Sequence, residues 1–540
     1  MGHAVASSAI LSSFFLCLYS TLATPVPEEN FLRCFSTHSS TPNAGSQVMI
    51  IHTPNNSTSN YTSDLPPTIL HPKPQISEPH RPKTSLLIVT PTQKSHVRAS
   101  TSAAQTVGCS SESEARAMTT KAFPSSYLSS YARPFIVVDL LNLRSIAVHL
   151  RSQTMWVQAG ATLGEVYHKI ANASNMLGFP AGICHTIGTG GHFGAGGIGT
   201  LMRKQGLAAD HIIDASFIDA EGRILNRKSM GEGLFWAIRG GGASSFGVVL
   251  EWKIRLVHVP PTVTAFTFSK TLEQGATKLV GKWQSIAHQF PEDLFIRLLI
   301  QPRNGSTIQL IFNSLFLGTL EKLMLLMHER FPELGLQRKD CLEMSWIEST
   351  VYFSGVNSVD GLLNRGLQFK AFYKAKSDFL EKPISQIGLE GIWKRLLEDD
   401  TMYMIIDPMG GKMSRISASK IAFPYRKRYI YSILYFVIWG DGDDNGEKHL
   451  DSIRRLHEYL TPHVSQSPRG AYLNCRDLDL GMNQEGNVSY STARVWGEQY
   501  FGANFKRLAR VKGAVDPTNF FLYEQSIPPL PAESRVIKCR

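Results

Sequence analysis

The sequence lacks the residue patterns of several common classes of functional site. Its seven cysteines form no Cys-x-x-Cys pair and no two histidines lie four residues apart, so no metal site is predicted. It contains no Gly-x-Ser-x-Gly motif, which argues against a serine hydrolase of that type. No apolar run reaches about eighteen residues, so no membrane association is predicted.

Charged residues make up only 18% of the 540 residues, and their formal net charge is +11. A nucleic-acid-binding surface needs basic residues clustered on one face. Here they form only short groups such as residues 426–428, without interleaved aromatic residues. We therefore expect no nucleic-acid partner. The positive charge favours contact with an acidic cell-wall polysaccharide.

The N-terminus predicts secretion, to the extracellular space or the cell wall. An apolar run over residues 9–22 is followed by Ala-Thr-Pro, which is typical of a signal peptide that covers residues 1–23. Asparagine glycosylation sequons, which suit a secreted glycoprotein, begin at Asn55, Asn56, Asn60, Asn172, Asn304 and Asn487. The number of cysteines is odd, so at least one has no cysteine partner within the chain.

Hydrophobic patterning predicts an α+β protein with several domains. Residues 85–90, 135–140 and 155–160 have the pattern of buried strands, and residues 163–173 that of a helix. A further strand is expected over residues 429–439 and a helix over residues 446–460. Residues 24–82 form an N-terminal segment that is rich in Ser, Thr, Pro and Asn over residues 40–83 and shows no clear period there.

Glycine is concentrated in residues 178–199. Gly194, Gly196 and Gly199 match the spacing of a dinucleotide-binding fingerprint, and Asp219 follows about twenty residues later. We reject that interpretation because the fingerprint must follow a buried strand directly, and here a glycine-rich loop precedes it. The glycines instead allow backbone N–H groups to approach a pyrophosphate closely. Cys184 on this loop is either a thiol that bonds to a flavin ring or a small buried apolar residue, and His192 is either functional or a loop histidine with satisfied hydrogen bonds.

A second glycine run covers residues 236–249. It follows residues 219–225, which predict a hairpin turn before a strand. Taken alone, this run is as well explained by a structural loop as by a binding loop.

Several ordered blocks along residues 30–530 resemble the plant berberine bridge enzyme-like (reticuline oxidase-like) family of FAD-linked oxidases. They are residues 133–140, the Cys184 loop, residues 227–232, the run after Arg239, and residues 472–481, 516–521 and 524–531. The resemblance implies a PCMH-type, vanillyl-alcohol-oxidase-like fold. Its FAD-binding domain, in two subdomains, would cover residues 83–258, a substrate domain with an antiparallel sheet residues 259–470, and a C-terminal segment that returns to the FAD domain residues 471–530.

The resemblance also implies a site and a reaction. Flavin would accept a hydride from a small alcohol, phenolic, alkaloid or carbohydrate, a base would take the substrate's proton, and O2 would become hydrogen peroxide. In the family FAD is usually held by two covalent bonds, one to the cysteine that corresponds to Cys184 and one to an upstream histidine. The FAD-binding positions carried over from the family are Gly182, Cys184, Thr186, Gly188, Gly190, Gly191, His192, Gly196, Gly199, Val249, Tyr472 and Asn474.

The histidine anchor is missing from this chain. Where the family has Arg-Ser-Gly-Gly-His-Asp-Tyr-Glu-Gly, residues 111–124 read Ser-Glu-Ser-Glu-Ala-Arg-Ala-Met-Thr-Thr-Lys-Ala-Phe-Pro. Codons can be chosen for residues 117–124 so that dropping two bases yields His-Asp-Tyr-Glu-Gly-Leu-Ser. We therefore hypothesise that residues near 57–80 and 101–132 are translated out of frame. Such stretches should be poorly packed, because no fold was selected for them.

The substrate side departs from the family as well. The family's base position, tyrosine in Tyr-x-Asn-Tyr-Arg-Asp, is Cys475. Its ordinary pKa of about 8.5 would let the thiol carry a proton, but the side chain is too short to reach where a phenol oxygen would lie. Ser432 and Leu434 replace the usual Lys and Gln. The catalytic residues are therefore unassigned, and three hypotheses stand: an FAD-dependent oxidase of weakened activity, an inactive secreted remnant, or a flavin-binding or cell-wall-binding protein without turnover.

Overall fold

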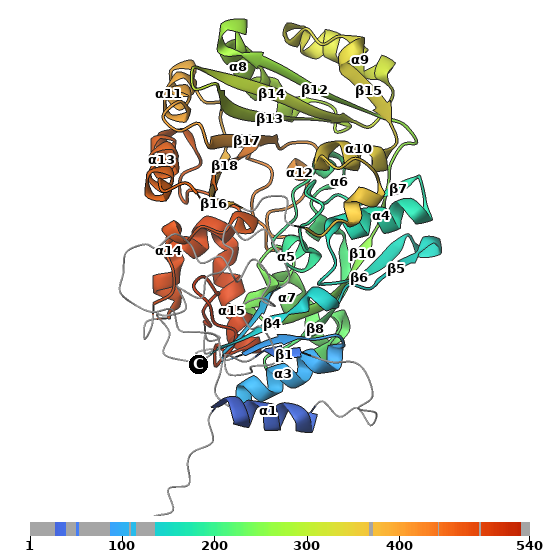
Figure 1. The fold of residues 1–540 in the computed structure, drawn as a ribbon, viewed down its shortest axis with the longest axis vertical. Coiled ribbons are helices and arrows are strands. Elements are labelled where there is room, and N and C mark those ends of the chain that lie inside the picture. The colour runs from blue at the N-terminus through green and yellow to red at the C-terminus, as the bar shows by residue number, and fades with distance from the viewer. Residues whose placement is uncertain are drawn as a thin grey trace, which may run out of the picture.

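The computed structural model describes residues 27–38, 50–52, 87–106, 110–114, 135–366, 371–440, 442–484 and 488–530. The predicted signal peptide and residues 57–80 lie outside these ranges. Within them, no helix is both long and apolar enough to cross a membrane. Three larger sheets organise the chain, two in its first half and one in its second (Figure 1).

A four-stranded sheet has the order β1-β2-β4-β3. Strands β2 (Leu87–Thr90) and β3 (Ser110–Glu114) are both parallel to β4 (Phe135–Asp139), whereas β1 (Ile50–His52) is antiparallel to β2. Helix α3 (Lys94–Thr106) follows β2, and α1 (Pro27–His38) packs on α3 at the bottom of Figure 1. The sequence had predicted the strands that became β2 and β4, which are buried and apolar as expected.

Residues 101–106 complete α3, although they begin the segment expected to be out of frame. Thr101, Ala103 and Ala104 are buried, and the Thr101 hydroxyl donates a hydrogen bond to the Val97 carbonyl at 3.0 Å. The expectation of poor packing is therefore wrong for Thr101, Ala103 and Ala104, because these small side chains fit closely between the helix and its neighbours. Strand β3 pairs with β4 through its backbone, and residues 115–132 lie outside the described part of the chain.

The second sheet is antiparallel and has the order β5-β6-β10-β8-β9. Its strands are β5 (Ile146–His149), β6 (Thr154–Gln158), β8 (Ile212–Ile218), β9 (Ile224–Leu225) and β10 (Val248–Arg255). The turn from β8 to β9 is the predicted hairpin, in which the Asp219 carboxylate accepts hydrogen bonds from the N–H groups of Glu221 and Arg223. Asp219 thus stabilises a turn, which supports the rejection of the dinucleotide fingerprint.

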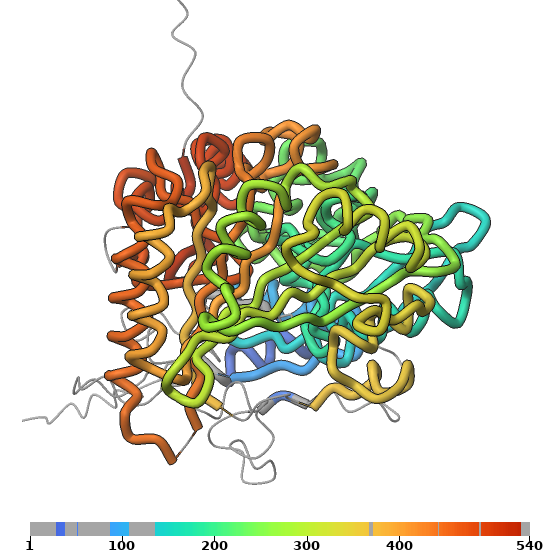
Figure 2. Tube along the Cα trace, turned by 90° about the horizontal axis from the view of Figure 1, so that it is seen from above, coloured from blue at the N-terminus to red at the C-terminus, as the bar shows by residue number. Residues whose placement is uncertain are grey.

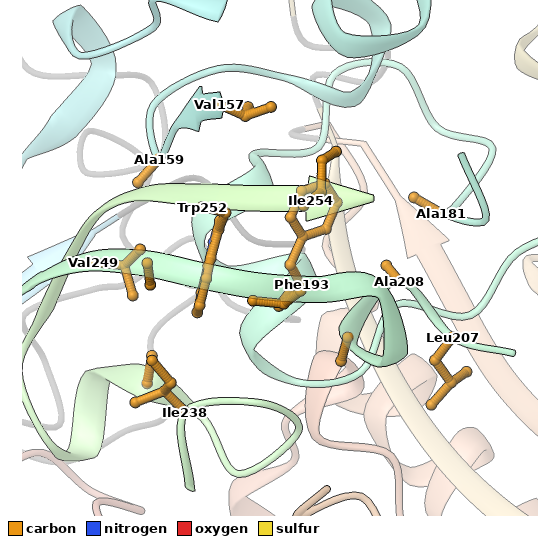
Figure 3. Close-up of a cluster of buried hydrophobic side chains, with 14 of the residues drawn as sticks. Val157, Ala159, Ala181, Phe193, Leu207, Ala208, Ile238, Val249, Trp252 and Ile254 are labelled. Carbon is orange, nitrogen blue, oxygen red and sulfur yellow. The ribbon is translucent and has the colours of Figure 1, made fainter. Parts of the chain in front are cut away.

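The predicted helix over residues 163–173 is α4 (Leu163–Ala173). It begins with a capping box between Thr162 and Glu165. Helix α5 (Thr189–Gly194) lies against β10, and Figure 3 shows Phe193 of α5 gathered with Trp252 and Ile254 of β10. All three side chains are completely buried. Burial of each contributes about 1.5–3 kcal/mol, so this cluster fixes α5 on the sheet.

The third sheet is antiparallel and has the order β15-β12-β14-β13-β17-β18-β16. Its strands are β12 (Val263–Thr271), β13 (Leu294–Arg303), β14 (Thr307–Phe316), β15 (Cys341–Met344), β16 (Phe372–Leu380), β17 (Met402–Pro408) and β18 (Tyr431–Trp439). Helices α8 (Ala276–Ile286), α9 (Leu320–Arg330), α11 (Gln386–Leu396) and α13 (Gly446–Tyr459) pack on one face and share a core with it. Strand alternation turns the opposite face toward the first half of the chain, and Phe295, Leu315 and Phe379 on that face join its core.

Two buried arginines fasten this sheet to the first half of the chain. Arg203 on α6 (Met202–Gln205) donates hydrogen bonds to the carbonyls of Phe290, Leu294 and Met409, with a distance of 2.9 Å to Leu294. Arg426 forms a bidentate ion pair with Asp210 at 2.8 and 3.0 Å. Both arginines are at most 1% exposed, so these contacts are desolvated and directional.

The C-terminal part of the chain returns to the first half. Helices α14 (Tyr490–Phe501) and α15 (Phe505–Val515) lie together on one side of the molecule, shown in red in Figure 2. Lys512 on α15 is fully buried and donates hydrogen bonds to the Ser245 carbonyl at 2.6 Å, the Phe521 carbonyl at 3.0 Å and the Asp516 carboxylate at 2.6 Å. The return predicted for this segment is thereby confirmed.

A histidine bridges two carboxylates where β18 leads into α13. The two ring nitrogens of His449 lie 2.7 Å from the Asp399 carboxylate and 2.9 Å from that of Asp443, and its ring stacks on Trp439. Burial opposes the imidazolium charge, but the hydrogen bonds to both carboxylates outweigh it and raise the pKa of His449. The charged ring thus holds the loop before α13 to the loop before β17.

Candidate active site

The Cys184 loop is held rigidly by α4 and by His192. The amides of Leu163 and Gly164 donate to the carbonyls of Ile187 and His185, both at 2.9 Å. The Tyr167 hydroxyl donates to the Gly182 carbonyl at 2.6 Å. Between these fixed points the Cys184 side chain is half-buried, with its Sγ 3.4 Å from the Thr186 hydroxyl oxygen. The Cys184 thiol thus has a defined position and is not completely buried in the core.

His192 supports this loop from beneath. Its Nε2 accepts a hydrogen bond from the Gly182 amide at 3.0 Å, so that nitrogen carries no proton. Burial lowers the pKa of His192 to about 4, which keeps the ring neutral. A Cβ at Gly182 would lie 3.0 Å from the His192 ring, so the close approach requires glycine. The structure thus shows the Nε2 of His192 engaged within the loop, and its role toward a cofactor stays a prediction.

The predicted glycines lie on and around α5. Gly188 is the N-cap of this helix, Gly190 and Gly191 lie in its first turns, and Gly196, at φ +122°, follows its end. A Cβ at Gly199 would lie 1.8 Å from the Ala181 carbonyl oxygen, so the two sides of the loop touch through backbone alone. Several backbone amides here already donate to protein carbonyls, among them that of Thr189 to Ala161 at 2.8 Å and that of Gly190 to Ala159 at 3.1 Å, so the segment is fixed on the second sheet.

Tyr472 and Asn474 join the C-terminal segment to the glycine loop. The Tyr472 hydroxyl oxygen accepts hydrogen bonds from the amides of Gly197 and Ile198, both at 3.1 Å. The Asn474 amide donates to the same hydroxyl at 2.8 Å and to the His192 carbonyl at 3.1 Å. The sequence placed these residues about 280 positions apart, and the structure brings them together. Val249 is a buried residue of β10, the strand against which α5 packs.

Cys475 follows directly and is buried. Burial, and then the nearby Asp477 charge, raise the pKa of its thiol to about 12. A proton-transfer role for this thiol stays a prediction, and its raised pKa argues against it. A group that stays neutral near pH 7 accepts no proton from a substrate.

A buried ion network holds the Cys475 loop against β16. The Asp477 carboxylate lies 2.5 Å from the Lys374 ammonium and 2.6 Å from that of Lys376, and the Asp479 carboxylate lies 3.2 and 2.9 Å from the same two groups. The Ser377 hydroxyl accepts a hydrogen bond from the Tyr472 amide at 2.8 Å. These contacts fix where Cys475 stands relative to the third sheet.

Sequence reasoning missed two phenols that complete the site. Tyr373 on β16 and Tyr403 on β17 lie close enough to Cys184 and Cys475 to interact with both thiols electrostatically. Burial raises the pKa of each phenol, so both stay protonated. Strand parity could have found them, because Tyr403 and Ile405 alternate with the core residues of β17.

The sheet face beside these phenols is largely apolar. Leu434 on β18 packs against the main core, Phe436 stacks on Tyr403 with ring centroids 5.0 Å apart, and Ser432 is buried. The sequence-based expectation that Leu434 cannot move a proton agrees with this setting. The one carboxylate on the β17 part of this face, Asp407, forms a bidentate ion pair with Arg297 at 2.6 and 2.7 Å.

These residues fit a covalently held flavin. The half-buried Cys184 supplies a thiol, and the close contacts of Gly182 with His192 and of Gly199 with Ala181 hold its loop in one shape. Among the described residues, no group of three His, Cys, Asp or Glu side chains is placed to hold a metal ion. The described part of the site therefore offers a thiol and phenols to its ligands.

Two family models match the chain. Residues 87–227 match the FAD binding domain and residues 471–528 match the model described as berberine and berberine like. The chain is 46% identical over 531 residues to O-acetylstemmadenine oxidase of Catharanthus roseus, which covers 96% of this chain and 98% of that protein. It is 48% identical over 412 residues to monolignol oxidoreductase AtBBE-like 13 of Arabidopsis thaliana, covering 75% of this chain and 76% of that one.

A solved structure agrees with these matches. The structure of BBE-like #28 from Arabidopsis thaliana superposes with a TM-score of 0.83 at 40% identity, covering 93% of this chain and 100% of that one. The resemblance and the PCMH-type α+β fold inferred from the sequence are thus confirmed. The chain belongs to the berberine bridge enzyme-like family of FAD-linked oxidoreductases, which act on small molecules.

Proposed function

We propose that this protein is a secreted oxidase of aromatic alcohols, with FAD attached covalently through Cys184 alone and with activity weaker than that of doubly anchored relatives. The observation that carries the proposal is the half-buried thiol of Cys184 on a rigid loop, within electrostatic range of two phenols. Bound flavin would supply hydride acceptance from the substrate and reoxidation by O2.

The residues of this chain would do the positioning. Tyr167 and His192 hold the Cys184 loop, and Tyr472 and Asn474 hold the glycine loop that would receive the cofactor. The third sheet would close the substrate side and keep out water, since Leu434 and Phe436 are apolar. Burial raises the pKa of Tyr472 and of Cys475, and the Nε2 of His192 already accepts a hydrogen bond from the Gly182 amide, so none of these three is a free general base, which supports weak turnover.

An aromatic substrate suits the apolar face better than a carbohydrate does. The stacked rings of Tyr403 and Phe436 offer planar apolar contact, whereas sugar binding needs many polar partners. One relative is named for its action on monolignols, which are aromatic alcohols, so coniferyl alcohol is the substrate to test first. Secretion is supported by the apolar N-terminus and by exposed Asn172 and Asn304 in sequons.

The test uses the protein secreted from eukaryotic cells. Acid precipitation should leave yellow flavin with the wild-type pellet and release it from Cys184→Ala. Cys341→Ala is the matched control, because Cys341 is a cysteine on β15 outside the site. Hydrogen peroxide released with coniferyl alcohol measures turnover. Colourless wild-type protein would exclude the proposal, and yellow protein without peroxide would exclude the oxidase part of it.

The second candidate is a flavin-binding protein without turnover. The observation that favours it is the Cys475 thiol, which has replaced the family's base position and stays neutral. The same peroxide measurement decides between the two.

A further inference from the structure

We propose that the hydroxyl of Tyr403 binds the oxygen of the substrate and supplies the phenol that is missing at position 475. This inference rests on the proposed function, because it names a residue of the same site. It begins from the geometry of β17, in which Tyr403 pairs with Phe436 of β18 and points to the face opposite the helices.

The ring of Tyr403 is fixed in place. It stacks on Phe436 with an interplanar angle of 12° and a centroid distance of 5.0 Å. Both rings stand on central strands of the sheet, between β13 and β16. A phenol held in this way loses little conformational freedom when it binds a ligand.

The hydroxyl of Tyr403 is unused within the protein. Among the residues that the structure describes, it makes no hydrogen bond, whereas the Tyr472 hydroxyl takes part in three. The Tyr403 side chain is only partly buried, and its hydroxyl is not one of the sealed polar atoms without a partner, so the group is open to donate a hydrogen bond to a ligand.

Its neighbours identify that ligand as the substrate. Tyr403 lies in electrostatic range of Cys184, which marks the flavin position, and of Cys475, which marks the family's base position. The Cys475 loop is held against β16 by the ion pairs of Asp477 with Lys374 and Lys376. The Tyr403 phenol therefore extends from the sheet toward the substrate position. A tyrosine at position 475 would extend toward the same position from the loop.

The phenol acts as a hydrogen-bond donor. Burial raises its pKa, so the hydroxyl keeps its proton and does not serve as a base. Donation to an alcohol or aldehyde oxygen orients that oxygen and involves no net proton transfer. An oxygen acceptor on the ligand is therefore required, and a hydrocarbon of the same shape should bind less well.

The experiment compares Tyr403→Phe with Tyr352→Phe in the flavin-loaded enzyme. Tyr352 on α10 (Trp346–Ser354) is the matched control, because its hydroxyl pairs with Thr267 outside the site. Loss of the Tyr403 hydroxyl should lower kcat/KM for coniferyl alcohol about tenfold, the effect of one lost hydrogen bond. Tyr403→His, which retains a ring N–H donor, should restore part of this loss. Phenylalanine keeps the ring and removes only the hydroxyl, so a kcat/KM of Tyr403→Phe within twofold of wild type would overturn the inference, as would an equal loss in Tyr352→Phe.

A binding measurement separates this inference from the proposed function. Cinnamaldehyde and β-methylstyrene, which lacks the oxygen, are titrated into wild-type and variant proteins while the flavin absorbance is followed. The wild type should prefer the aldehyde about tenfold and Tyr403→Phe should not. A wild type without turnover that shows this preference would refute the oxidase and support the role of Tyr403. A wild type that lacks the preference would refute the role of Tyr403 whether or not it turns over, and this test needs no variant to fold.

Discussion

Asp477→Asn should destabilise the protein strongly, because it breaks the ion network between the C-terminal segment and the third sheet. The Asp477 carboxylate lies 2.5 and 2.6 Å from two lysine ammonium groups, and its side chain is 3% exposed. Asparagine keeps the shape but removes the charge, leaving Lys374 and Lys376 with Asp479 as their only carboxylate. Breaking a buried ion pair on one side costs about 3–5 kcal/mol, and that is the loss expected in the free energy of unfolding.

The pH dependence adds a second test of the same reasoning. Burial raises the pKa of Asp477, but the charges of Lys374 and Lys376 outweigh it and hold the pKa below its ordinary value. A carboxyl with a lowered folded pKa contributes stability that is fully present above its unfolded pKa of about 3.9 and is lost as the pH falls through the folded value. The difference between wild type and Asp477→Asn should therefore stay constant from pH 8 to pH 5.

Urea unfolding followed by tryptophan fluorescence measures this difference. Glu321→Gln is the control, because Glu321 forms a surface ion pair with Arg338 and both side chains are over 60% exposed. That substitution should leave the unfolding midpoint unchanged. A loss below about 1 kcal/mol for Asp477→Asn, or one that changes between pH 8 and pH 5, would show that the network does not hold the segment as argued.

Two further predictions concern the glycine loop and the histidine bridge. Gly199→Ala should abolish flavin retention, because the added Cβ would lie 1.8 Å from a carbonyl oxygen. The control Gly281→Ala on α8 should be neutral or stabilising, because nothing lies within 4 Å of its added Cβ. The flavin absorbance per protein measures both variants. His449→Gln should lower stability most below pH 6.5, because a raised histidine pKa contributes stability that is present below the unfolded pKa and lost as the pH rises through the folded one. Thermal unfolding of both proteins from pH 5 to pH 9 checks this, and a pH-independent difference would contradict it.

The sequence predicted local elements well where their signals were local. The helix over residues 163–173 begins and ends as expected, because a capping box and apolar periodicity define it without outside help. The strand expected at residues 429–439 became β18, and the helix expected at 446–460 became α13, each within two residues. Cys184 was found because its loop has an unusual glycine content.

The parts that escaped prediction depend on contacts between distant residues. The high pKa of Cys475 arises from its burial under the third sheet, which no local pattern encodes. Tyr403 looks like an ordinary strand aromatic until the sheet order places β17 between β13 and β18. The ion pair of Lys376 could not be predicted from local sequence, because its partner Asp477 lies 101 residues later and meets β16 only in the folded chain.

The frame hypothesis now makes a prediction about the flavin bond. Residues 101–106 pack well, yet their side chains are small, and the pairing of β3 with β4 uses the backbone, so neither observation requires the encoded side chains. If the transcript across codons 50–135 reads as the protein does, the family's His-Asp-Tyr-Glu-Gly motif is absent and Cys184 is the sole covalent anchor. Cys184→Ala should then release all its flavin on acid precipitation. If compensating bases restore the motif, the protein made from that transcript should keep its flavin in Cys184→Ala through the histidine. The motif read from the transcript must therefore match the flavin retention of the Cys184→Ala variant made from that transcript. Flavin that is retained although the motif is not restored would refute the assignment of Cys184 as the single anchor.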